Sequence, residues 1–401
     1  MFEFMSILDK LRKVNRMSKE EMVFLSNLFC EDMNVKESLK MLPAHIYMDK
    51  AIKPGEYIAL DFGGSNVRIM LYKISENGES ELLNSRLIRL RGKNYDYTSS
   101  EYELRDVFVT IVEKMKEMVD KDKTYLLGHT FSFPASSVSK NEAIVVGLSK
   151  GFTLRNAIGQ DVNKLLLEVI NEAGLNVTPV TLLNDTTATL LAGKSKNANT
   201  DIACIVGTGH NICFVDNDQQ IVNTECGAFD MGIPLNSYDK SFLRMIPKEG
   251  HNVMEALVGG KNSAKLAMNL INRIEKEAGK KFKFGGITPK LLSMALDDRF
   301  EDDFAGGIEE KIILKHIAKI MYDRAAQLVV SEIMGILKRI DPNLEREHHI
   351  VFDGSVYEKT PYFRKCISKY IKLMYPVKFK QIRHSLVKDG SSLGAAISAA
   401  M

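Results

Sequence analysis

The sequence predicts an α/β protein built from two related halves. Segments with the apolar spacing of strands and of helices alternate along much of the chain. A pattern of strand, glycine turn and strand occurs twice, first over residues 57–74 and again over residues 201–216. Because each copy opens an α/β segment, the repetition indicates duplicated halves that face each other across a cleft.

The composition is that of an ordinary globular protein. The 401 residues are 45% hydrophobic and 26% charged, and this length predicts two or three domains. Basic and acidic residues are interspersed and give a net charge of +3, so no nucleic-acid partner is expected. The sequence lacks both a run of the ~18–20 apolar residues that cross a bilayer and the apolar start of a signal peptide. We therefore expect a cytoplasmic protein with no membrane partner.

The thiols and imidazoles follow no metal-binding pattern. The five cysteines are widely spaced and include no CxxC pair, which predicts reduced, mostly structural thiols. None of the eight histidines stands at a ligand spacing, and His348 and His349 are adjacent. The histidines are therefore predicted to be structural.

The first half begins with helical periodicity and continues as alternating strands and helices. Apolar residues over residues 6–30 predict an amphipathic N-terminal helix or a pair of helices. Residues 57–61 and 67–74 predict a hairpin around a glycine tip. Helices are then predicted near residues 102–119 and 161–173, and strands over residues 124–133 and 177–183.

The second half repeats the hairpin and then becomes strongly helical. Strands are predicted over residues 201–206 and 212–216, helices around residues 263–276 and 311–338, a buried strand over residues 350–352, and an alanine-rich helix after residue 391. We expect a helical segment that packs on the large domain (1–55), a small α/β domain (56–184), a large α/β domain (185–388) and a C-terminal helix that returns to the small domain (389–401).

Three glycine turns follow predicted strands. Residues 61–66 (DFGGSN) place an acidic side chain beside backbone N–H groups that attract anions, although an ordinary hairpin turn is the alternative. This turn lacks the Lys-Ser/Thr ending of a Walker loop. Residues 207–209 and 353–355 supply two more such turns. Together the three favour binding of a polyphosphate.

Asp185 is the candidate catalytic group. It follows an apolar strand and precedes a helix predicted over residues 188–192. One reading is that Asp185 or Thr186 caps that helix. The other is that the carboxylate, placed at a strand end, accepts a hydroxyl proton as the oxygen attacks phosphorus.

Several polar residues stand among apolar neighbours. The carboxylate of Glu225 lies within NTECGAF, where unpaired burial would be costly, so Glu225 should have a partner. Glu255 fits either an inward carboxylate or an exposed helical glutamate. Ser132, Ser149 and Lys150 add hydroxyl and ammonium groups. A polyhydroxylated ligand requires many such groups, because each unmatched hydroxyl weakens binding.

Taken in order, these segments resemble the eukaryotic-type hexokinase and glucokinase family. The resemblance covers nearly the whole chain and is carried by residues 39–43 (LKMLP), 59–68 (ALDFGGSNVR), 128–134 (GHTFSFP), 149–152 (SKGF), 183–186 (LNDT), 207–211 (GTGHN), 223–229 (NTECGAF) and 353–357 (DGSVY).

The resemblance implies a two-lobed actin/Hsp70-like (ribonuclease H-like) ATPase fold whose central cleft closes around sugar and Mg–ATP. It implies that Asp185 is the general base, and that Mg²⁺ is carried by ATP with no direct protein ligand, near Asp61 and Asp185, with Asp61 acting through water. The implied sugar-binding residues are Ser132, Ser149, Lys150, Asn184, Asn211, Glu225 and Glu255. The implied nucleotide-binding residues are Asp61, Gly63, Gly64, Ser65, Asn66, Arg68, Thr208, Lys261, Gly354 and Ser355.

The chain departs from the family pattern at several positions. The family's Trp-Thr-Lys-Gly-Phe is here residues 148–152 (LSKGF), and the tryptophan after the sugar-binding glutamate is Cys226. The loop at residues 135–137 (ASS) lacks the usual charged pattern, and the C-terminal Gly-Ser-Gly-x-Gly is GSSLG at residues 390–394. These departures concern sugar preference more than the reaction class.

The sequence thus predicts an ATP-dependent hexokinase or glucokinase acting on the 6-OH of glucose or a related sugar. A kinase for another sugar and a sugar-binding sensor with weak catalysis are the alternatives, and a nucleotide-driven chaperone or filament protein fits the polar segments less well. We expect a monomer or a homodimer.

Overall fold

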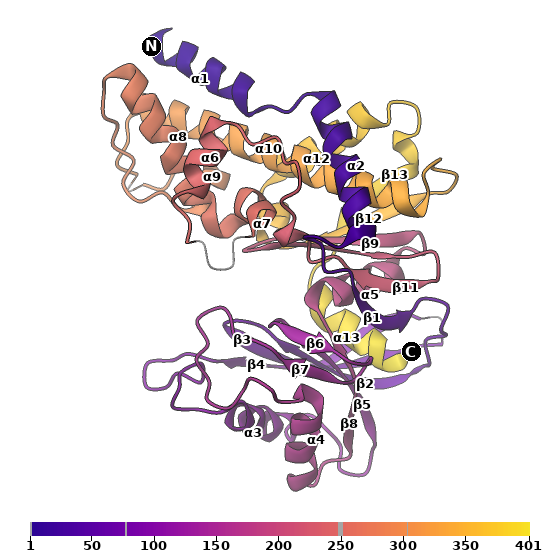
Figure 1. The fold of residues 1–401 in the computed structure, drawn as a ribbon. Helices are drawn as coiled ribbons and strands as arrows, with labels where there is room; N and C mark the ends of the chain where they lie inside the picture. The colour runs from indigo at the N-terminus through magenta and orange to yellow at the C-terminus, as the bar shows by residue number, and fades with distance from the viewer. Residues whose placement is uncertain (1, 77, 248–251, 303) are drawn as a thin grey trace. The chain divides into compact units, whose positions relative to one another are not determined.

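The computed structural model describes residues 2–76, 78–247, 252–302 and 304–401 (Figure 1). The chain divides into two compact units, and each is formed by segments from different parts of the sequence. Unit 1 comprises Met1–Met41, Cys204–Ile212 and Thr224–Leu386. Unit 2 comprises Leu42–Ala203, Cys213–Asn223 and Val387–Met401.

Unit 2 contains a five-stranded mixed sheet in the order β4-β3-β2-β5-β8. Strand β3 is antiparallel to both of its neighbours, β4 and β2, whereas β5 and β8 run parallel to β2. The first predicted hairpin is therefore confirmed as the β2–β3 pair. The strands are β2 (Gly55–Phe62), β3 (Asn66–Ile74), β4 (Ser80–Arg89), β5 (Tyr125–Phe131) and β8 (Val177–Leu183).

Helix α13 (Gly390–Ala400) packs closely on this sheet and on helix α5 (Asp185–Lys196) (Figure 1). A Cβ atom on Gly128 of β5 would lie 1.9 Å from the carbonyl oxygen of Ala395, and a Cβ atom on Gly394 would lie 1.8 Å from that of Ala188. Because these two glycines have no side chains, the backbone of α13 packs directly against the backbones of β5 and α5. An apolar cluster around Phe62 joins the sheet to α3 (Leu104–Met115) and α4 (Val162–Glu172).

A six-stranded sheet has the order β1-β11-β10-β9-β12-β13, and a two-stranded sheet pairs β6 with β7. Strands β9 and β10 form around the second predicted glycine turn, as expected. Strand β12 pairs in parallel with β13. The strands are β1 (Leu42–Tyr47), β6 (Ala135–Ser137), β7 (Ala143–Val145), β9 (Thr200–Val206), β10 (His210–Val215), β11 (Gln220–Asn223), β12 (His348–Asp353) and β13 (Ile382–Leu386).

Unit 1 is organised around the long helix α10 (Ile308–Ile340), which packs against α2 (Lys19–Val35) and α12 (Pro361–Met374) (Figure 1). The guanidinium of Arg324 on α10 is buried, forms an ion pair with Asp239 and donates to the carbonyl of Asn15 at the end of α1. The remaining helices are α1 (Phe2–Asn15), α6 (Ser237–Leu243), α7 (Val253–Val258), α8 (Ser263–Ala278), α9 (Pro289–Ala295) and α11 (Ser355–Lys359).

The described helices include none that combines the length and apolar character needed to cross a membrane. All five cysteines are free thiols, as the sequence predicts.

Candidate active site

The first glycine turn closes the β2–β3 hairpin of unit 2. The backbone N–H of Gly63 donates to the carbonyl of Asn66 at 3.1 Å, and Asp61 stands opposite Arg68 in the antiparallel register. The Arg68 guanidinium lies 3.7 Å from a carboxylate oxygen of Asp61 and 3.8 Å from one of Asp389. Asp389, which precedes α13, is a neighbour of this site that sequence reasoning did not identify.

The predicted sugar-binding residues of the 132–150 region lie beside the same turn. The backbone N–H of Ser132, which directly follows β5, donates to the carbonyl of Phe62 at 3.3 Å, so Ser132 lies beside the end of β2. Lys150 has a positive φ of 57° and places its ammonium 5.5 Å from the centre of the Phe133 ring. A Cβ atom on Gly64 would lie 2.6 Å from Cδ of Lys150. The lysine stem therefore lies directly against the glycine turn.

A second arginine supports the segment that carries Ser149 and Lys150. Arg91 donates to the carbonyl of Gly151 at 3.1 Å and to the hydroxyl of Thr98 at 2.9 Å. The backbone N–H of Phe152 closes the turn onto the carbonyl of Ser149 at 3.1 Å. The sequence gives no sign of this role for Arg91, because the contact joins residues sixty positions apart.

Asn184 and Asp185 stand where β8 ends and α5 begins. Asn184 is the N-cap, and its side-chain oxygen accepts the backbone N–H of Thr186 at 2.8 Å. The reading in which Asp185 or Thr186 caps the helix is therefore wrong. The Asp185 carboxylate is half-buried in the first turn of α5, 3.3 Å from the Thr186 hydroxyl. The positive end of the helix dipole favours a negative charge there.

Three glycine segments of unit 1 meet around the β9–β10 turn. The backbone N–H of Gly260 donates to the carbonyl of Gly207 at 2.7 Å, and that of Lys261 donates to the carbonyl of Thr208 at 3.0 Å. Gly354 has a φ of 102°, and a Cβ atom there would lie 2.5 Å from the carbonyl of Val206. The structure thus brings together four residues predicted from separate motifs to bind nucleotide: Thr208, Lys261, Gly354 and Ser355, the last opening helix α11.

The predicted sugar carboxylates of unit 1 also have partners. The side-chain amide of Asn211 donates to Glu225 at 3.2 Å, which confirms the expectation that Glu225 is paired. Glu255, on α7, is partly buried and accepts the backbone N–H of His210 at 3.3 Å. The exposed alternative for Glu255 is therefore wrong.

The family is decided by comparison with known proteins. One hexokinase family model matches residues 7–195 and a second hexokinase model matches residues 201–401. The chain belongs to the hexokinase family. The two models meet between α5 and β9, where the sequence pattern starts again.

Named relatives of this hexokinase-family chain come from animals, plants and fungi. Hexokinase-2 of Equus caballus is 27% identical over 98% of this chain and 48% of its own length. Hexokinase-1 of Saccharomyces cerevisiae is 27% identical over 86% of the chain and 80% of its own. Chloroplastic Hexokinase-4 of Oryza sativa subsp. japonica is 26% identical over 90% and 80%. The chain spans about half the length of the first of these relatives.

Solved hexokinases share the fold. A hexokinase crystal structure superposes with a TM-score of 0.86 at 22% identity, covering 100% of this chain and 99% of that one. The Schistosoma mansoni hexokinase complexed with glucose gives 0.80 at 23% identity, covering 99% and 98%. The predicted fold class, an α/β fold of the two-lobed actin/Hsp70-like kind, is confirmed.

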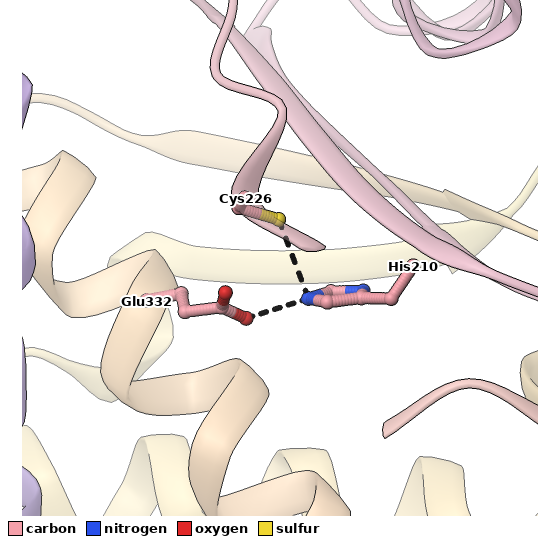
Figure 2. Close-up of side chains that lie close together, drawn as sticks. All are labelled: His210, Cys226 and Glu332. Carbon is pink, nitrogen blue, oxygen red and sulfur yellow. Dashed lines mark hydrogen bonds and ion pairs between the residues drawn. The ribbon is translucent and has the colours of Figure 1, made fainter. Parts of the chain in front are cut away.

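Cys226, which replaces the tryptophan of the hexokinase pattern, lies in a buried polar cluster with His210 and Glu332 (Figure 2). His210 Nε2 lies 2.6 Å from Glu332 Oε2 and 3.4 Å from the sulfur of Cys226. Burial lowers the pKa of His210, but the Glu332 carboxylate and the Ile205 carbonyl raise it above its ordinary value. Burial raises the pKa of the Cys226 thiol well above its usual range. We call these three residues the His210 cluster.

Proposed function

We propose that this chain transfers the γ-phosphoryl group of ATP to a hexose hydroxyl, with the 6-OH of glucose as the first candidate acceptor. The observation that carries the proposal is the position of Asp185. Its carboxylate stands in the first turn of α5, yet capping of that helix is done by Asn184. A carboxylate at a strand end with no capping role is suited to proton transfer.

The proposed reaction uses Asp185 as the general base. As the sugar oxygen bonds to the γ-phosphorus, its proton passes to the Asp185 carboxylate, and the bond between that phosphorus and the bridging oxygen breaks to leave ADP. A positioned base of this kind contributes roughly 10²- to 10⁴-fold in rate. The remaining acceleration is assigned to positioning of the two substrates.

Each unit, taken by itself, supplies polar groups that suit sugar hydroxyls. In unit 1, Glu225 and Asn211 form one hydrogen-bonded pair and Glu255 a second acceptor. In unit 2, the proposed ligands are Ser132, Ser149, Lys150 and Asn184. Carboxylates and amides suit this role because they accept or donate several hydrogen bonds to adjacent hydroxyls.

The nucleotide phosphates are assigned to the glycine turns. Turn N–H groups bind anions, and the turn 61–66 and the segments around Gly207 and Gly354 supply them. The donor set fits Mg²⁺, which takes carboxylate oxygens and retains water, because Asp61 carries a carboxylate beside the first turn. Mg²⁺ would neutralise phosphate charge when bound, and Asp61 is proposed to hold it through water, with Asp185 nearby.

Another sugar as acceptor is the second candidate. Leu148 and Cys226 stand where the hexokinase pattern has tryptophan, so the packing around the sugar-binding residues differs from that pattern. A sugar-binding sensor with weak catalysis is the third. Cytoplasmic location and a monomeric or homodimeric state remain predictions.

An acceptor panel tests the function. The chain is incubated with ATP, Mg²⁺ and glucose, mannose, fructose or glucosamine, and ADP release and sugar phosphate are both measured. We expect glucose-dependent ADP release with glucose 6-phosphate as product. Turnover of a different sugar alone would correct the acceptor. Tight sugar binding without ADP release would favour the sensor and contradict the proposal.

A further inference from the structure

The His210 cluster holds one shared proton between His210 and Glu332. His210 Nδ1 lies 3.0 Å from the carbonyl oxygen of Ile205, which only accepts, so Nδ1 carries a proton and donates. Nε2 lies 2.6 Å from Glu332 Oε2. Two bare acceptor atoms would repel each other at this distance, so a proton lies between Nε2 and Oε2. The pair is therefore neutral overall, which suits its complete burial.

The spacing of the His210 cluster suits a proton better than a metal ion. A tetrahedral zinc ion, with bonds of about 2.0–2.2 Å to nitrogen and oxygen, would separate these two ligand atoms by about 3.4 Å. The observed 2.6 Å is that of a charge-assisted hydrogen bond. Bound zinc would require His210 and Glu332 to move apart.

The shared-proton pair is connected to both proposed sugar carboxylates of unit 1. The backbone N–H of His210 donates to Glu255. Cys226, whose sulfur touches His210 Nε2, directly follows Glu225 and begins the short 3-10 turn Cys226–Ala228. Glu225 itself has a left-handed φ of 55°, a conformation that neighbouring structure must maintain.

We infer that the His210–Glu332 pair is a positioning device for the sugar carboxylates, acting through the backbone N–H of His210 on Glu255 and through Cys226 on Glu225. His210 and Glu332 are positioning residues, not catalytic ones. The inference rests on the proposed function, because it assigns the cluster to sugar binding. Loss of the pair should weaken sugar binding and leave the ATP site unaffected.

The test compares three variants of the full chain. Glu332→Leu removes the carboxylate, and the double variant with His210→Leu removes both polar groups so that neither is left buried without a partner. Glu332→Gln keeps a hydrogen bond to Nε2 through its amide. Sugar KM, ATP KM, kcat and melting temperature are measured for each, together with the zinc content of the purified unaltered chain.

The expected result is a sugar KM raised about tenfold or more in Glu332→Leu and in the double variant, since losing a hydrogen bond between a sugar hydroxyl and a carboxylate weakens binding by about that factor. ATP KM and kcat should stay within about threefold, and Glu332→Gln should restore most of the sugar affinity.

The control is Asp341→Asn, which weakens another buried histidine–carboxylate pair of unit 1, where His348 Nε2 lies 3.0 Å from Asp341. This control should lower the melting temperature without raising sugar KM.

Three results would overturn the inference. They are an unchanged sugar KM in a folded, active double variant, an equal rise in sugar KM in the Asp341→Asn control, and one tightly bound zinc per unaltered chain. Failure of the unaltered chain to phosphorylate any sugar would overturn the proposed function together with this inference. The three results above overturn the inference alone, so the two failures are distinguishable.

Discussion

Asn184 caps helix α5 through a 2.8 Å hydrogen bond from the backbone N–H of Thr186, and the next residue along the chain is Asp185. Asn184 and Asp185 therefore have different roles. The amide satisfies the helix end, while the carboxylate remains available for proton transfer. This division gives the first prediction.

Replacing Asn184 with alanine should destabilise the protein by about 1 kcal/mol, the usual cost of losing an N-cap. Asn184→Asp should retain the cap, because its carboxylate can accept the same N–H. Denaturant unfolding of the two variants measures the difference. Equal loss of stability in both would show that the cap contributes little.

Replacing Gly354 with alanine should weaken ATP binding. Its φ of 102° is unfavourable for a side chain, and a Cβ atom would meet Val206 at 2.5 Å and Gly207 at 2.7 Å, within the proposed phosphate turns. ATP KM should rise about tenfold or more, since a hydrogen bond to a charged phosphate contributes about that factor to binding.

Gly279→Ala is the matched control. Gly279 has a φ of 61°, but a Cβ atom there would have no neighbour within 4 Å. Both variants incur backbone strain, so only the effect on ATP KM should differ. A similar ATP KM in the two variants would contradict the assignment of Gly354 to nucleotide binding.

Replacing Glu225 with glutamine should raise sugar KM by about 10- to 100-fold, because hydrogen bonds to a charged group are worth about 1.5–3 kcal/mol. ATP KM should change little. Steady-state kinetics with each substrate varied gives the two values. The exposed glutamate Glu113 of α3, changed to glutamine, is the control. A rise in ATP KM as large as that in sugar KM would count against a role in sugar binding.

Two buried histidines should make stability depend on pH. Burial lowers the pKa of both His129 and His384 to about 4, below the ordinary 6.5. Between about pH 4 and pH 6.5, these histidines bind protons in the unfolded chain but not in the folded chain. The contribution of these two histidines to the free energy of unfolding should therefore be complete above pH 6.5 and decrease as pH falls towards 4, by up to about 1.4 kcal/mol per pH unit for each histidine.

Denaturant unfolding at pH 5 to 7.5 checks this dependence. His129→Leu should show a shallower decrease in stability with falling pH than the unaltered chain, even though it is less stable throughout. An unchanged slope would mean that His129 takes up a proton in the folded state as readily as in the unfolded one.

Local sequence patterns were sufficient for most elements of the fold. The long, regular apolar spacing of residues 311–338 predicts a helix there, and helix α10 is found at Ile308–Ile340. Strand β5 ends at Phe131 rather than residue 133, since Ser132 turns to hydrogen-bond with Phe62. Helix α3 ends at Met115 rather than near residue 119.

Contacts between distant residues could not be read from the sequence. Glu332 stands in the middle of α10, where a glutamate has the same helical spacing whether it faces solvent or the core. Its partner His210 is 122 residues away. The sequence patterns predict structural histidines, but they do not indicate that His210 pairs with Glu332. Likewise, the proximity of Asp389 to Arg68 depends on where α13 returns to the sheet.

The most direct test of the central claim is the turnover of Asp185→Asn with glucose, ATP and Mg²⁺. Asp161→Asn is the control, because Asp161 caps α4 in the same unit by accepting the N–H of Lys164. We predict that kcat falls about 10²- to 10⁴-fold in Asp185→Asn, with both substrates still bound and the fold intact. The control should retain its activity. A kcat for Asp185→Asn within threefold of the unaltered chain would contradict the assignment of Asp185 as the general base.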